Sequence, residues 1–164
     1  MNLQHSHCIQ CVAMILIATT LHASPIKINS GLASIHQTSH QHLFTQQVQM
    51  DDEYQHLRAE WVQVTTDDHN QLLSAIARGD STARAHVWST EKTPILHAYA
   101  NEIQYFPREH RVVLIGNAHL SEGENSFSAP KISYNTLTQH IISEAQGHER
   151  TTIILSQDHE HLIR

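Results

Sequence analysis

Apolar and polar side chains alternate along short segments of this chain, which is the pattern of strands with one buried face. The clearest example is a predicted hairpin in residues 114–134, with a polar, glycine-containing turn at residues 121–126. In its second strand the apolar residues Ala129 and Ile132 are three positions apart. The apolar residues therefore change from one set of alternate positions to the other between them, which we call a change of phase. Such a change requires a bulge or a sharp bend, which we expect at Pro130-Lys131.

The pattern of this hairpin occurs a second time, nearer to the start of the chain. Subtracting 70 from its apolar positions gives positions that are all apolar: Phe44, Val48, Met50, Leu57, Ala59, Val62 and Val64. The change of phase recurs as well, here at Glu60-Trp61. Because one hairpin cannot bury its own apolar face, the repetition predicts a stacked β architecture in which two copies cover each other.

Alternation or β-branched composition predicts strands at residues 25–30, 43–50, 57–65, 83–88, 95–105, 111–120 and 151–155. Residues 32–42 are either a marginal strand or a loop. Residues 71–77 favour a helical turn by propensity, but the repeat equates Leu72 with Ile142. We therefore predict strands there and at 139–144. Closely spaced strands with short turns are typical of an all-β sandwich, roll or barrel.

The start of the chain has a different composition. Residues 11–21 form an uninterrupted run without charge, and Ala23 is a small residue suited to cleavage, so residues 1–23 are predicted to be a secretory signal. Because no Lys or Arg precedes the run, an uncleaved anchor is the alternative. Cys8 and Cys11 both fall in this segment. Cleavage would leave no cysteine for a disulfide or a thiolate site.

The rest of the chain suits one domain, at residues 24–156, followed by a polar tail at residues 157–164. Its formal net charge of −6 argues against nucleic acid as a partner. No serine stands in a nucleophile-elbow motif, and no glycine-rich loop opens a helix to hold phosphate. We therefore predict that the chain is no enzyme and carries no cofactor.

Histidine is frequent, with 16 residues, which raises a periplasmic metal-binding protein as an alternative function. Two pairs have ligand-like spacing, His40-x-His42 and His159-x-His161, and residues 158–161 would make a plausible metal-binding tail. The histidines are nevertheless spread along the whole chain without an H-E-x-x-H context. We predict solvated histidines and no metal site.

The inward-facing positions mix large and small side chains, and this leaves two interpretations open. A sheet that folds on itself without enough bulky residues leaves an apolar groove, which suits acyl chains. A completely filled core is the other possibility. Periodicity alone does not separate the two.

Four stretches of the chain together resemble the OstA-like family of periplasmic proteins. They are Pro-Ile-Lys-Ile-Asn-Ser at 25–30, Tyr105 with 112–120, Lys-Ile-Ser-Tyr at 131–134, and Arg-Thr-Thr-Ile-Ile-Leu at 150–155. Their order and spacing cover nearly the whole mature chain. The resemblance implies a twisted β-jellyroll of antiparallel strands, open at both ends. It also implies a periplasmic carrier that takes lipopolysaccharide by its acyl chains and catalyses no reaction.

The resemblance also implies partners and leaves one alternative within the family. Such proteins bridge an LptC-like partner, anchored in the inner membrane, and an LptD-like translocon in the outer membrane, and they associate head to tail through edge strands. The alternative is that the chain is another OstA-like component of the same export machinery.

Carried over position by position, the resemblance assigns roles to individual residues. The lipid-facing groove would be formed by Ile26, Ile28, Tyr105, Leu114, Leu120, Phe127, Ile132 and Tyr134, with Val48 and Ile103 added on alternation alone. The edge strands for assembly would contain Ile26, Lys27, Ile28, Thr152, Ile153, Ile154 and Leu155.

The chain departs from the family at three places. Gln46-Gln47 replaces a Gly-Asn pair, Pro130 stands where a turn-type Gly or Asp is usual, and Ala85 stands where an aromatic residue is common. The last departure puts a groove contact at Ala85 in doubt.

Overall fold

The computed structural model describes residues 26–36, 38–91, 93–135, 137–138, 140–145 and 147–156. The predicted signal segment and the predicted C-terminal tail lie outside these residues. Within the described residues the chain forms antiparallel strands and one short 3-10 helix, η2 (Pro107–Glu109), which confirms the all-β fold class. None of the described segments is a helix long and apolar enough to cross a membrane.

The strands follow one another with short connections. In chain order they are β1 (Lys27–Asn29), β2 (Leu32–His36), β3 (Gln41–Asp51), β4 (Gln55–Thr66), β5 (Leu72–Arg78), β6 (Ala85–Ser89), β7 (Leu96–Ala100), β8 (Glu102–Phe106), β9 (Arg111–Glu122), β10 (Asn125–Asn135), β11 (His140–Glu144) and β12 (Thr152–Ile154).

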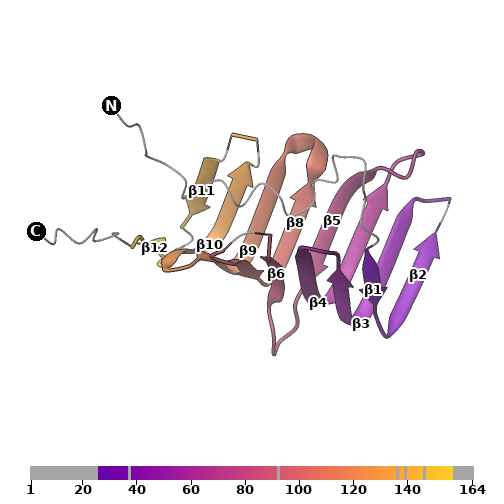
Figure 1. The fold of residues 1–164 in the computed structure, drawn as a ribbon, viewed down its shortest axis with the longest axis horizontal. Helices are drawn as coiled ribbons and strands as arrows, with labels where there is room; N and C mark the ends of the chain where they lie inside the picture. The colour runs from indigo at the N-terminus through magenta and orange to yellow at the C-terminus, as the bar shows by residue number, and fades with distance from the viewer. Residues whose placement is uncertain are drawn as a thin grey trace, which may run out of the picture.

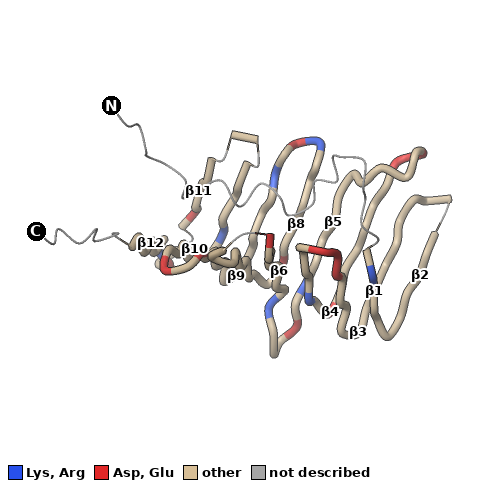
Figure 2. The backbone as a smooth tube through the Cα atoms, in the orientation of Figure 1, with Lys and Arg blue, Asp and Glu red and all other residues tan. Residues whose placement is uncertain are grey.

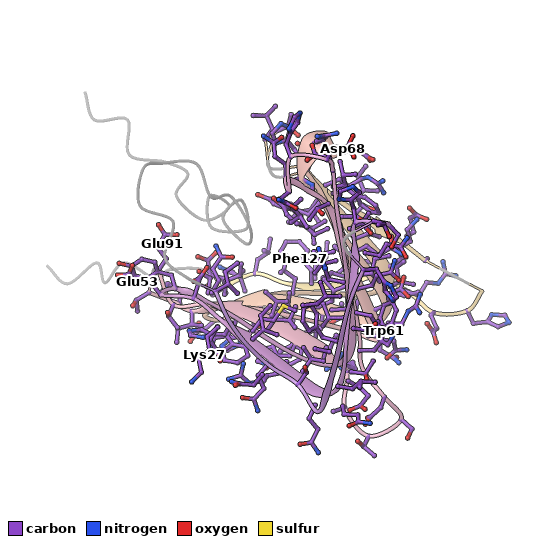
Figure 3. The ribbon with its side chains drawn as sticks, turned by 90° about the vertical axis from the view of Figure 1, so that its right-hand side faces the viewer. Lys27, Glu53, Trp61, Asp68, Glu91 and Phe127 are labelled. Atoms are coloured by element: carbon purple, nitrogen blue, oxygen red, sulfur yellow. The ribbon has the colours of Figure 1, made fainter. Side chains whose placement is uncertain are left out.

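The strands belong to one hydrogen-bonded sheet that is folded into two layers. Four long strands, β3, β4, β9 and β10, pass through both layers. One layer has the order β1-β3-β4-β6-β7-β9-β10-β12 and the other has the order β2-β3-β4-β5-β8-β9-β10-β11. The sheet therefore extends from β1 and β2 at one end to β11 and β12 at the other (Figure 1). Viewed from its end it is V-shaped, with Phe127 between the arms and Trp61 outside (Figure 3).

The fold line of the V is a pair of β-bulges, at equivalent positions of the two copies. Gln46 and Gln47 in β3 have φ values of 67° and 58°, and Gly116 and Asn117 in β9 have φ values of 74° and 48°. The register with the neighbouring strand shifts at the same places, between Thr45 and Val48 in β3 and opposite Ala129–Lys131 of β10. An extra residue with positive φ bends a strand and increases its twist, and this carries the strand from one layer into the other.

The bulges correct one prediction made from the sequence. The phase change was expected to come from an irregularity at Pro130-Lys131 and at Glu60-Trp61. It does occur in β10 and β4, but the extra residues are in the partner strands β9 and β3. A bulge lengthens one strand only, so the shorter partner shows the phase change while the bulged strand keeps its even spacing of apolar residues.

The predicted repeat is a repeat of six strands. Within β1–β6, β3 pairs with β1, β2 and β4, and β4 pairs with β5 and β6. Within β7–β12, β9 pairs with β7, β8 and β10, and β10 pairs with β11 and β12. The two repeats are joined where β5 pairs with β8 and β6 pairs with β7.

The constant offset between the two repeats does not hold beyond β10. Ile142 faces Ser133, as Ile76 faces Gln63 in the first repeat. The structural equivalent of Ile142 is therefore Ile76, and the predicted equivalence with Leu72 was wrong. The connection between β10 and β11 is shorter, and periodicity of the apolar positions does not reveal a change of loop length.

Two other predictions change at the level of single strands. Residues 95–105 were expected to form one strand, but Asn101 separates β7 from β8, and these two strands belong to different layers. Residues 32–42 contain strand β2 and the start of β3. The strand predicted at 71–77 is confirmed as β5.

The inward-facing side chains of both layers form one apolar core. It contains Phe44, Val48, Val62, Ala77, Ala85, Val87, Leu96, Ala98, Ala100, Ile103, Tyr105, Val112, Leu114, Ala118, Leu120, Ala129, Ile132 and Tyr134. Ala85 and Ala100 face each other across the junction of the repeats and are fully buried. Small side chains at this pair let the two repeats approach closely.

Candidate functional site: an apolar cleft between the two layers

The core leaves a cleft of about 310 Å³, which is lined mostly by the first repeat and completed by β8 and β9 of the second. Its apolar lining consists of Ile26, Ile28, Met50, Leu57, Val62, Val64, Leu72, Ala75, Ala77, Val87, Ile103, Tyr105 and Val112. Polar residues add to the lining at Asp52, Gln55, His56, Thr66 and Asn70. A cleft of this size and character is typical of sites for apolar ligands.

The alternation of the strands explains how the cleft is lined. Met50 and Leu57 face each other across β3 and β4 near one end, and Ile28 faces Met50 from β1. Small side chains explain why the space is not filled, because β5 presents Ala75 and Ala77 to the interior. Neither alanine reaches as far as a leucine or phenylalanine would, so the wall is apolar but set back.

Two charged side chains next to the cleft, Asp51 and Arg58, alternate along β3 and β4 with the lining residues Met50 and Leu57 and so lie on the outer face. Asp51 accepts hydrogen bonds from Arg58 and from the Nδ1 of His56, each over 2.9 Å. Partial burial raises the pKa of Asp51, but the hydrogen bonds from Arg58 and His56 outweigh it and hold the pKa below its usual value. Figure 2 shows that charged residues along the chain lie mainly at the turns between strands.

The ten predicted groove residues all lie on the inner face, but only four of them line the cleft. These four are Ile26, Ile28, Ile103 and Tyr105. Burial raises the pKa of the Tyr105 hydroxyl. The other six were Val48, Leu114, Leu120, Ile132 and Tyr134, which are buried in the core, and Phe127, which packs against it.

Most of the lining was missed by the residue assignments made from the sequence. Met50, Leu57, Val62 and Val64 belong to the repeat pattern, so that pattern already carried the signal for them. Val112 was identified only as part of a family-like stretch. No pattern in the sequence distinguishes the first repeat, which supplies most of the lining, from the second, because both have the same alternation of apolar positions.

The predicted edge residues lie on exposed strands at opposite ends of the molecule. Lys27 and Ile28 are in β1, Thr152, Ile153 and Ile154 are in β12, and Ile26 and Leu155 directly adjoin these strands. Ile153 and Ile154 are 53% and 56% exposed. In the described part of the chain β1 pairs with β3 alone and β12 with β10 alone. Likewise β2 pairs with β3 alone and β11 pairs with β10 alone among the described strands, and the prediction did not include these two edges.

A stack of aromatic rings covers the outer face where the two repeats join. His86 lies between Trp88 and Tyr99, with ring centroids 4.5 Å and 4.0 Å away, and its Nε2 is 3.1 Å from the Nδ1 of His97. Burial, and then the electrostatic influence of His97, Arg58 and Arg84, lower the pKa of His86 to about 4. His86 is therefore neutral at pH 7 and packs as an aromatic ring.

The described residues contain no group of three or more His, Cys, Asp or Glu side chains that could hold a metal ion. The histidines of the predicted tail, His159 and His161, lie outside the described residues.

Comparison with known proteins gives a family and a fold. The family described as LptA/(LptD N-terminal domain) LPS transport protein matches residues 27–140. No curated protein matches the chain. The fold is similar to the crystal structure of LptH, the LptA-homologous periplasmic component of the lipopolysaccharide transport device of Pseudomonas aeruginosa. The TM-score is 0.70, the sequences are 20% identical, and the match covers 82% of this chain and 96% of LptH.

The match to the family covers most of the chain, and the fold agrees with the predicted jellyroll. The family is one of transport proteins, which agrees with the expectation that the chain is no enzyme. This chain belongs to the LptA/LptD N-terminal domain family of lipopolysaccharide transport proteins.

Proposed function

We propose that this protein is a periplasmic carrier that holds lipopolysaccharide by its acyl chains in the cleft between its two layers. The observation that carries the proposal is the cleft itself, which is walled by apolar side chains in a chain of this transport family. The homologous fold of LptH, a periplasmic component of such a device, supports the location.

Burial of acyl chains is the expected source of affinity. Each buried methylene contributes about 0.8 kcal/mol before the costs of ordering. The chain has a net charge of −6 and lipopolysaccharide is anionic, so long-range attraction between the two is unfavourable. Binding should therefore weaken little when the salt concentration is raised.

A photoreactive residue in the wall of the cleft tests this proposal. We expect lipopolysaccharide adducts when Ile28 or Leu72 is replaced, because both side chains line the cleft. Gln49 is the matched control, since it is exposed and lies between the inward residues Val48 and Met50 in β3. Equal labelling at all three positions would rule out the cleft as the binding site.

We further propose that copies of the protein join end to end through their edge strands. Exposed edges are normally a risk for aggregation, and a protein that retains them can use them for strand addition. The junction between the two repeats provides a template. There β6 and β5 pair with β7 and β8, so at the end of the molecule β12 and β11 would pair with β1 and β2 of the next copy.

The template also gives a register for the contact. At the internal junction Val87 of β6 faces Ala98 of β7. Ile153 faces Phe127 in the second repeat, and Val87 faces Leu57 in the first. Because Phe127 and Leu57 are equivalent positions of the two repeats, Ile153 takes the place of Val87. Ile28 takes the place of Ala98, because the two residues occupy the same position in the first and second repeats. Ile153 of one copy would therefore face Ile28 of the next.

The same edges are suited to the two membrane partners. An LptC-like protein at the inner membrane and an LptD-like translocon at the outer membrane would each offer a jellyroll edge, one to β1 and β2 and the other to β11 and β12. Pairing at both ends would align the cleft with those of the partners. The protein would then bridge the two membranes without catalysing a reaction.

A further inference from the structure

Two buried polar atoms on the inner face of β3 and β4 have no hydrogen-bond partner among the described residues. They are the Nδ1 of His42 and the Oγ1 of Thr66. Thr66 lines the apolar cleft. Native proteins satisfy nearly all of their buried polar groups, because a buried group without a partner costs stability. Two such atoms beside a ligand cleft point to a hydrogen-bonding group that the ligand supplies.

The strand register brings the two side chains together. His42 faces Val64 across β3 and β4, and Val64 lines the cleft, so His42 is on the inner face as well. Thr66 is two residues beyond Val64 on the same face, which makes it the diagonal neighbour of His42 at a spacing of roughly 7–8 Å. The backbone N–H of Thr66 donates to the carbonyl oxygen of His40 over 2.9 Å and fixes this end of β4.

The second repeat shows that a polar residue is not needed at this place in the fold. The equivalent of His42 in the second repeat is Val112, a buried residue that also lines the cleft. An apolar residue therefore fits the inner face at this strand position. The imidazole of His42 brings a hydrogen-bonding atom to a position of the inner face that is apolar in the second repeat.

Two other polar residues of the lining, Asp52 and His56, differ from Thr66. Asp52 belongs to the turn between β3 and β4, and its Oδ1 accepts hydrogen bonds from the backbone N–H groups of Tyr54 and Gln55. His56 is paired with Asp51. These groups have protein partners, so they do not require one from a ligand.

We propose that Thr66 and His42 determine specificity by hydrogen-bonding a hydroxyl group carried by a bound acyl chain. The inference rests on the proposed function and adds the kind of chain that is preferred. A threonine hydroxyl donates or accepts, and an imidazole nitrogen does either according to its tautomer. A plain hydrocarbon chain would leave both atoms unpaired, whereas a chain with an oxygen at this depth would satisfy them.

The test compares two ligands of equal length, tetradecanoic acid and 3-hydroxytetradecanoic acid. Each acid competes with a polarity-sensitive fluorescent dye bound to the full mature protein. We expect the hydroxylated acid to bind roughly 2- to 10-fold more tightly, the range for one net hydrogen bond. In Thr66→Val the ratio should fall to about 1.

Matched variants separate the hydroxyl group from other effects. Thr66→Ser keeps the hydroxyl and should keep the preference. Thr65→Val changes the adjacent residue, whose side chain points to the opposite face of β4, and should have no effect. His42→Phe should reduce the preference, and it decides the outcome if Thr66→Val does not fold. A ratio of 1 in the wild type, or an unchanged ratio in both Thr66→Val and His42→Phe, would overturn the inference and leave the carrier function intact. Failure of both acids to displace the dye would overturn the carrier function as well.

Discussion

The backbone N–H of Asn101 donates a hydrogen bond to the carbonyl oxygen of Gly116 over 2.8 Å. The same contact occurs at the equivalent place in the first repeat, where the N–H of Gly31 donates to the carbonyl oxygen of Gln46 over 2.9 Å. In each repeat the short connection between the first two strands is thus tied to the bulge of the third. This link lets the chain pass from one layer to the other at the same place as the long strands do.

Substitution of Gly116 should destabilise the fold strongly. Its φ is +74°, and an added Cβ would lie 2.6 Å from the side-chain nitrogen of Asn101. We expect Gly116→Ala to lower the free energy of unfolding by about 2–4 kcal/mol, from backbone strain and overpacking together. Gly147→Ala is the control, because its φ is also positive but nothing lies within 4 Å of the added atom. Equal losses in urea denaturation would show that the contact with Asn101 is unimportant.

Glycine in place of Gln47 should stabilise the protein, although glycine in a strand normally has the opposite effect. Gln47 has a φ of 58°, a conformation that costs side chains energy and that glycine adopts freely. We expect Gln47→Gly to raise the free energy of unfolding by about 0.5–1 kcal/mol. Gln49→Gly, in the regular part of β3, should lower it. A loss of stability in both variants would contradict the role given to the bulge.

The proposed register of the end-to-end contact can be tested with cysteine pairs. If Ile153 of one copy faces Ile28 of the next, the double variant Ile28→Cys/Ile153→Cys should form a ladder of disulfide-linked oligomers on mild oxidation. Ile28→Cys combined with Ile154→Cys should give much less, because adjacent residues of a strand point to opposite faces. Non-reducing electrophoresis measures both. Similar ladders from the two pairs would mean that the contact is non-specific.

Stability should decline on acidification through the stack at the repeat junction. The pKa of His86 is lowered to about 4 in the folded protein, by burial first and then by nearby positive charge, while an unfolded histidine titrates near 6.5. Between these values the unfolded state binds more protons, so stability is fully present above pH 6.5 and falls as the pH drops towards 4. The lowered pKa of His119 acts in the same direction.

The control for this prediction is His86→Phe, which keeps a ring between Trp88 and Tyr99 but has no proton to gain. Urea denaturation at several pH values between 4 and 7 should show a shallower decline for the variant than for the wild type. Parallel declines would assign the pH dependence to other groups.

The predictions that succeeded depend on local periodicity. Alternation identified the hairpins, and the constant offset between their apolar positions identified the repeat, because both arise from which side of a strand each residue faces. The same reasoning could not place the extra residue of the bulge. A phase change in β10 looks the same in sequence whether β10 or its partner is irregular, and the pairing with β9 decides between them.

The candidate site was predictable only as an inner face. The sequence by itself placed Ile103 on the inner face through strand alternation, and its resemblance to a family placed Ile28, Tyr105 and Ile132 there as well. Only the tertiary structure decided which of these residues line open space. Ile132 is fully buried while Ile28 borders the cleft. The difference depends on how far the two layers lie apart and on where small residues, such as Ala75 and Ala77 of β5, face the interior. These distances are set by the bulges and by packing between distant strands, which no local pattern encodes.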